Sequence, residues 1–184
     1  MKFAPRLLPL LERKTDRLVA TLAAAPPKDL HRPPVPKAWS PFQVMQHVGL
    51  VERASVDYLL YKFGDEAPPP RQSLRTRLNG KLVIAGLVSP LKFKAPEPVD
   101  VSGQDLLDAP TLTEVRDVLR GARADLRDLI ARAPSTWLEG AVFRHPVAGR
   151  MSLDDLALML LVHHNRHARQ IERGLAKNAR DHRG

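Results

Sequence analysis

Residues 151–173, MSLDDLALMLLVHHNRHARQIER, combine the start signal of a helix with three histidines inside five positions. Ser152 and Asp155 have the spacing of a capping box, which marks the first turn of a helix. Apolar residues then recur at helical spacing, among them Leu160 and Ile171. The pattern predicts one long helix that begins after Ser152 and continues past Ile171 into a basic tail from about residue 176.

Four further helices are predicted by the same kinds of signal, and prolines gather in the connections between them. They cover, approximately, residues 4–24, 41–63, 73–88 and 111–133. Ser40 and Pro41 supply an N-cap and a first helical residue for the second of these helices. Thr111 and Glu114 have the spacing of another capping box. Two glycines weaken the helix over residues 73–88.

The connections complete the expected architecture. Residues 89–110 read as a long loop, and residues 137–151 read as a short segment of turns or extended chain. Nothing alternates with period two for long, and no internal repeat is present. We therefore expect an all-α protein: an antiparallel four-helix bundle with an additional short helix and long loops. A length of 184 residues suits one domain over residues 1–184.

Composition excludes several classes of function. The chain has no cysteine, which removes disulfides, thiolate metal ligands and a cysteine nucleophile. It has no uncharged apolar run of about 18 residues, so we expect no membrane partner. The N-terminus becomes charged too early for a signal peptide, and a cytoplasmic protein is the expectation.

The net charge of +9 belongs to the two ends of the chain. Residues 1–40 and 166–184 carry the whole basic excess, and the stretch between them is neutral. Basic ends favour an anionic partner, such as an acidic substrate or an anionic surface. Nucleic acid is not expected, because no aromatic residues are interleaved with the basic ones to stack on bases.

The histidines suggest a metal site. His163 and His167 lie four residues apart, so on a helix they project from nearly the same face and can share one divalent ion. His164 and His167 are three apart and can also chelate, and periodicity alone does not choose between the two pairs. A third ligand must come from elsewhere, and His47 lies on an apolar stripe that should point inward. The alternative for each is a neutral core imidazole bonded to one partner.

At these residues the sequence resembles the DinB-like superfamily of metal-binding four-helix bundles, in its DinB_2-type branch. The resemblance rests on three stretches, which together cover most of residues 38–175: WSPFQVMQHVGLVER (39–53), FKAPEPV (93–99) and RHPVAGRMSLDDLALMLLVHHNRHARQIER (144–173). It implies a DinB/YfiT-like fold. It also implies three metal ligands: His47 after the WSP turn, and the pair His163 and His167, whose second member precedes Gln170 and Ile171.

The resemblance further implies an enzyme. Superfamily members are similar to thiol-dependent transferases that use a low-molecular-weight thiol, and others to hydrolases. A three-histidine site leaves a position open for water or substrate, and zinc or nickel is the expected ion. Without cysteine in the chain, a thiol has to arrive as cosubstrate. A small-molecule substrate and a homodimer are implied. The alternative is a non-catalytic module whose basic ends bind an anionic partner, with structural histidines.

Five other residues have expected roles around or beyond the predicted site. His145 precedes the last helix and either lines the mouth of the site or packs in a turn. His164 packs or bonds locally, and Gln170 hydrogen-bonds near the site. Arg150 binds an anionic substrate group or is a simple loop charge. Glu52 is expected to be a surface salt-bridge partner.

Overall fold

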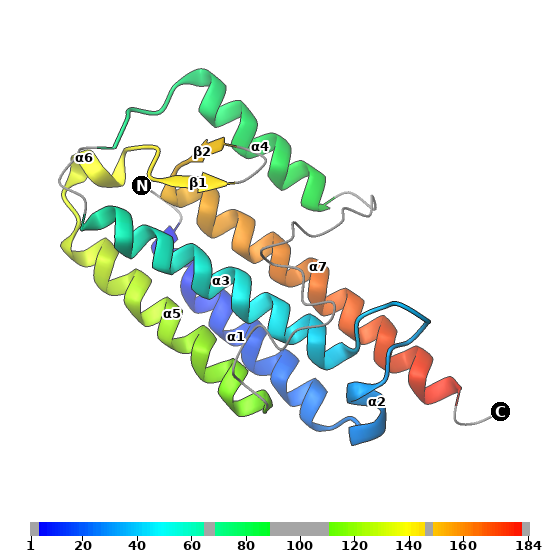
Figure 1. The fold of residues 1–184 in the computed structure, drawn as a ribbon. Coiled ribbons are helices and arrows are strands. Elements are labelled where there is room, and N and C mark those ends of the chain that lie inside the picture. The colour runs from blue at the N-terminus through cyan, green and yellow to red at the C-terminus, as the bar shows by residue number, and fades with distance from the viewer. Residues whose placement is uncertain (1–3, 65–68, 89–110, 146–148, 182–184) are drawn as a thin grey trace.

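The computed structural model describes residues 4–64, 69–88, 111–145 and 149–181, and in these the chain is mostly helical (Figure 1). The elements are α1 (Ala4–Ala23), α2 (Pro27–His31), α3 (Pro41–Phe63), α4 (Leu74–Val88), α5 (Leu112–Arg132), α6 (Ser135–Leu138), β1 (Phe143–His145), β2 (Gly149–Met151) and α7 (Leu153–Arg180). All five helices predicted from the sequence are confirmed. The short helices α2 and α6 were not predicted. The expected loop over residues 89–110 lies outside the described residues.

Three of the long helices begin with capping boxes. In each box, the side chain of the N-cap residue accepts a hydrogen bond from the backbone N–H three residues later. The side chain of that later residue accepts a hydrogen bond from the backbone N–H of the N-cap residue. The pairs are Ser40 with Gln43 for α3, Thr111 with Glu114 for α5, and Ser152 with Asp155 for α7. These caps fix where α3 and α7 begin, and the candidate site is built from those two helices.

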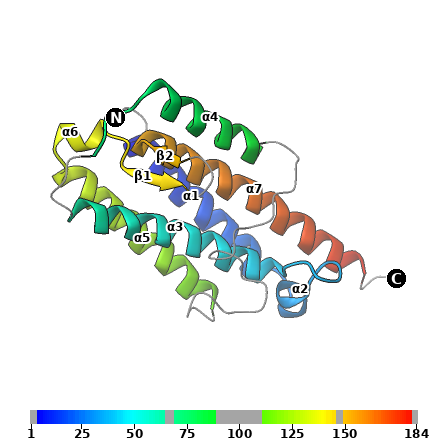
Figure 2. The same cartoon turned by 45° about the horizontal axis from the view of Figure 1, so that its top comes forward.

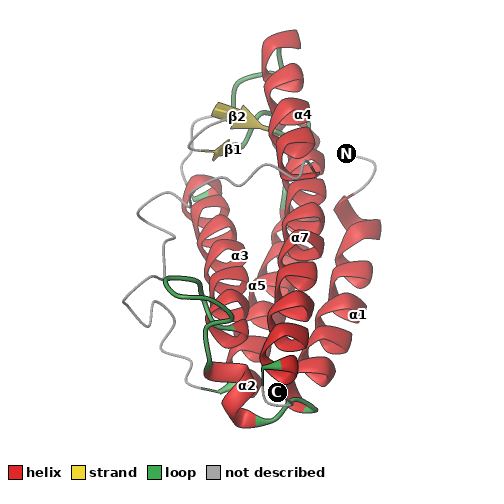
Figure 3. Cartoon of the chain, turned by 90° about the vertical axis from the view of Figure 1, so that its right-hand side faces the viewer, coloured by secondary structure: helices red, strands yellow, loops and turns green. Residues whose placement is uncertain are grey.

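The long helices α1, α3, α5 and α7 pack side by side, each against two of the others (Figure 3). Helices α1 and α7 run one way, and α3 and α5 run the other way (Figure 1). The contacts between α1 and α5 and between α3 and α7 are therefore antiparallel, as expected. The contacts between α1 and α7 and between α3 and α5 are parallel, which the sequence analysis did not predict. A long connection over residues 64–111 makes a parallel pair possible, whereas short connections give antiparallel neighbours.

Helix α4 lies outside these four, along α7 and against the β1–β2 hairpin (Figure 2). Gly80 lets α4 approach closely, because a Cβ at this position would lie 3.2 Å from the Cγ of Asp155. Near the end of α4, Nη1 of Arg166 on α7 donates to the carbonyl of Leu87 at 3.2 Å. None of the described helices combines the length and the apolar character needed to cross a bilayer.

The core consists of two apolar clusters with polar residues between them. One cluster gathers around Leu11, Leu59 and Leu126, towards the hairpin. The other gathers around Leu22 and residues such as Met45 and Leu119, towards α2. Each of the four long helices has a buried polar residue where its members of the two clusters meet: Thr15, Glu52, Arg123 and His164. The centre of the molecule is therefore a polar layer.

Glu52 belongs to this layer, so the expectation of a surface salt bridge was wrong. Glu52 is 2% exposed, and its side chain faces Arg123, which is 0% exposed. Nη2 of Arg123 donates to Oε2 of Glu52 at 2.9 Å, and Nε donates to the other carboxylate oxygen. The expectation assumed that the face of the helix away from His47 meets solvent. Helix α3 is instead covered on two sides, by α5 and by α7.

Replacing Arg123 with leucine is expected to destabilise the fold strongly. The substitution leaves the Glu52 carboxylate buried without its cation, and such a loss costs about 3–5 kcal/mol in the free energy of unfolding. Urea denaturation followed by circular dichroism measures it. Arg127→Leu is the matched control, because Arg127 pairs with Glu12 on the surface and should cost less than about 1 kcal/mol. Equal losses in the two variants would contradict the prediction.

Candidate metal centre

His47, His163 and His167 meet between α3 and α7. Their candidate ligand nitrogens all lie within 4.8 Å of one another. The Nε2 atoms of His47 and His163 are 3.3 Å apart. The structure thus brings together the three residues that the resemblance implied, from positions more than a hundred residues apart in the sequence.

Helix geometry produces this arrangement. One turn separates His163 from His167 on α7, and their ring centroids are 4.4 Å apart. Helix α3 packs against the same face of α7, which places the His47 ring 5.2 Å from that of His163 and 4.9 Å from that of His167. The ring of Trp39, just before α3, lies 4.9 Å from His47 and forms an aromatic wall on that side.

Burial keeps the imidazoles of α7 neutral. His47 and His167 are 4% and 9% exposed, and His163 is partly buried. Burial, followed by the proximity of His47, lowers the pKa of His167 to about 3. Burial, followed by the proximity of His167 and His47, holds the pKa of His163 well below its ordinary value. At neutral pH both side chains are uncharged, which is the form that binds a metal.

Gln170 orients one of the rings. Its Oε1 lies 2.9 Å from Nδ1 of His167. An amide oxygen only accepts, so Nδ1 carries the proton and Nε2 keeps its lone pair for a ligand. Histidines that bind metals usually donate their second nitrogen in this way, which fixes both tautomer and ring orientation.

The third histidine of the run faces elsewhere. Nε2 of His164 lies 3.1 Å from Oγ1 of Thr15 on α1, and its side chain is fully inside the core. Burial, followed by the charges of Arg123 and Lys14, lowers its pKa to about 4. Of the two pairs that spacing allowed, the structure therefore turns His163 and His167 towards His47.

The two loop residues assigned to the pocket lie on the hairpin. His145 ends β1 opposite Gly149, and burial lowers its pKa. Arg150 is on β2, exposed, and opposite Arg144. Neither belongs to the group of three histidines described above.

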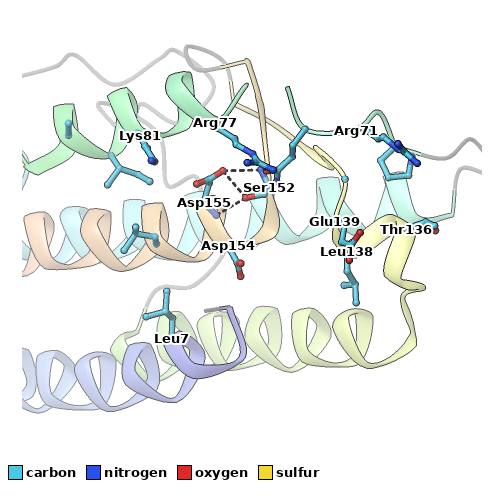
Figure 4. Close-up of a pocket in the computed structure, with 16 residues that line it drawn as sticks. Leu7, Arg71, Arg77, Lys81, Thr136, Leu138, Glu139, Ser152, Asp154 and Asp155 are labelled. Atoms are coloured by element: carbon cyan, nitrogen blue, oxygen red, sulfur yellow. Dashed lines mark hydrogen bonds between the residues drawn. The ribbon is translucent and has the colours of Figure 1, made fainter. Parts of the chain in front are cut away.

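A cavity of about 1380 Å³ lies between α4, α6 and the start of α7 (Figure 4). It is on a different side of α7 from the three histidines. Its charged lining residues are Arg71, Arg77, Lys81, Glu139, Asp154 and Asp155. None of the three clustered histidines lines it, and neither do His145 and Arg150. Leu158 of the lining lies only five residues before His163 on α7. Sequence reasoning missed this cavity because its walls come from several separate segments with no shared pattern.

A comparison with known families identifies the family of the chain. The chain belongs to the DinB superfamily, whose family model matches residues 10–171. That range contains His47, His163 and His167. Searches of curated proteins and of solved structures each found no match.

Replacing Gln170 with leucine is expected to weaken the binding of a divalent ion by about 10–100-fold, because His167 loses the acceptor that orients it. A zinc titration in competition with a chromogenic chelator measures the affinity. Arg169→Leu, at the exposed neighbouring position, is the control and should bind as the parent does. An unchanged affinity in Gln170→Leu would show that the hydrogen bond has no role in the site.

Proposed function

We propose that His47, His163 and His167 bind one divalent metal ion, zinc or nickel, at the centre of an enzyme of the thiol-transferase or hydrolase type. The observation that carries the proposal is the 3.3 Å between Nε2 of His47 and Nε2 of His163. Two nitrogens that each lie about 2.0–2.1 Å from a tetrahedral ion are separated by roughly 3.3–3.4 Å. Three imidazoles are also a suitable donor set for either ion.

The chain's own residues prepare this site in three ways. Burial keeps His163 and His167 uncharged, so their lone pairs are available. Gln170 directs Nε2 of His167 away from its own hydrogen bond and towards the other rings. Trp39 covers His47, which limits access of water from that side.

An ion held by three protein nitrogens keeps a position open, and it would supply Lewis-acid activation of a water molecule or a thiol. Because the chain has no cysteine, the thiol in the transferase reaction is a low-molecular-weight cosubstrate. The substrate proposed for this reaction is a small molecule, which would have to reach the three histidines themselves, because the cavity beside α7 lies on another side of that helix.

The remaining parts of the proposal concern the domain, the location and the assembly of the protein. We propose that α1, α3, α5 and α7 form the four-helix bundle of a single domain over residues 1–184. We also propose that the protein is cytoplasmic and acts as a homodimer. His145 and Arg150 are retained as proposed substrate-pocket residues, on the hairpin that lies against α4.

The metal content of protein purified without a histidine tag tests the ligand set. The parent is expected to hold about one ion per chain. His47→Ala, His163→Ala and His167→Ala should each lose it, because two imidazoles bind an ion far less tightly than three. Arg169→Ala, at an exposed position of α7, is the internal control and should retain the metal. Undiminished metal in His167→Ala would refute the assignment.

A chelator and a salt titration separate the enzyme from the alternative function. Activity in a screen of thiol-transfer and hydrolysis reactions should vanish on treatment with a chelator and return on addition of zinc or nickel. A non-catalytic module that binds anions through the basic ends predicts something different. Its affinity would fall steeply with rising salt and would not respond to the chelator.

A further inference from the structure

Four polar side chains, one from each long helix, form a continuous hydrogen-bonded network in the centre of the core. Arg123 on α5 donates through Nη2 to Glu52 on α3 at 2.9 Å and to Oγ1 of Thr15 on α1 at 3.0 Å. Oγ1 of Thr15 is in turn 3.1 Å from Nε2 of His164 on α7. A guanidinium only donates, so the Thr15 hydroxyl accepts from Arg123, and the tautomer of His164 sets which of the two groups donates in the bond between them.

This network adjoins the metal centre on both helices that carry ligands. On α7, His164 stands between His163 and His167 in the sequence. On α3, Glu52 follows His47 by five residues. The network therefore links α3 to α7 a second time, through α5 and α1, inside the core rather than across the metal site.

Stability alone does not account for such a network. Removing a charged pair from water is costly, and replacing a buried pair with apolar side chains of similar volume is often neutral or stabilising. Apolar packing is non-directional, and a core tolerates repacking when volume is kept. Hydrogen bonds of 2.9–3.1 Å between four helices are directional, so they define rotation and translation where apolar contacts do not.

We propose that Glu52, Arg123, Thr15 and His164 are positioning residues for the metal centre: they hold α7 against α3 in the register that brings His47 to His163 and His167. The inference rests on the proposed function, since it assigns these residues a role towards the metal ion. A slip of one residue along α7 would move the ligands by about 1.5 Å, which is too far for nitrogens that must share one ion.

Substitutions at Thr15 are the sharpest test, because valine keeps the shape of threonine and removes only the hydroxyl. Thr15→Val breaks the network between Arg123 and His164. Its affinity for cobalt(II) is expected to fall at least about tenfold, with an altered visible absorption spectrum of the bound ion. Thr15→Ser restores a hydroxyl and should recover the parent affinity and spectrum.

A double variant separates positioning from stability. Glu52→Leu combined with Arg123→Met replaces the charged pair by apolar side chains, and the protein should unfold at the same urea concentration as the parent or a higher one. Its cobalt affinity should still fall by about tenfold or more. The control is Glu12→Gln with Arg127→Gln, which removes an exposed pair between α1 and α5 and should bind cobalt as the parent does.

The outcomes distinguish this inference from the proposed function. If the parent binds cobalt and both Thr15→Val and the double variant bind it equally well, the positioning role is refuted and the metal centre stands. If the parent binds no divalent ion, the metal centre is refuted and the positioning role falls with it. Loss of affinity in the double variant without loss of stability supports the inference, even if Thr15→Val proves too unstable to purify.

Discussion

The carboxylate of Glu52 and the guanidinium of Arg123 meet in the interior, and neither can be left there alone. A buried charge without a partner is among the largest penalties that a single side chain can impose on a fold. Helices α3 and α5 therefore stay in the register that keeps the pair together, and Thr15 and His164 extend the same requirement to α1 and α7. The apolar clusters on either side supply most of the stabilisation. The polar layer between them selects which of many similar packings is adopted.

The structure separates the candidate ligands from the space in which a small molecule would fit. The histidines occupy the interface of α3 with α7, and the cavity occupies the interface of α4 with α7. Only α7 takes part in both. The three histidines lie in a well-packed part of the chain, while the cavity is lined by α4, α6 and the start of α7.

Local signals in the sequence were sufficient to predict the long helices, because the capping residues and the apolar periodicity of a helix lie within its own segment. Ser152 with Asp155 and Thr111 with Glu114 both form the boxes that their spacing predicted. Helices α2 and α6, of five and four residues, are too short to show a period.

Non-local features behaved differently. Spacing did not decide between His163 and His164, and only the resemblance favoured His163. The burial of Glu52 depends on its pairing with Arg123, 71 positions away. No pattern within either helix predicts that pairing. The parallel pairing of α3 with α5 likewise follows from a long connection, and not from either helix.

The contacts between α1 and α7 join the two ends of the chain: the amide of Ala4 donates to Asp154, 150 positions later, and Thr15 reaches His164 across 149. During synthesis, the ribosome releases α1, α3 and α5 before the helix that completes their core exists. Until α7 is present, the charged residues of the polar layer and both apolar clusters remain partly exposed to solvent. The core can therefore be completed only after α7 has emerged from the ribosome, so packing of α7 is a late step in folding.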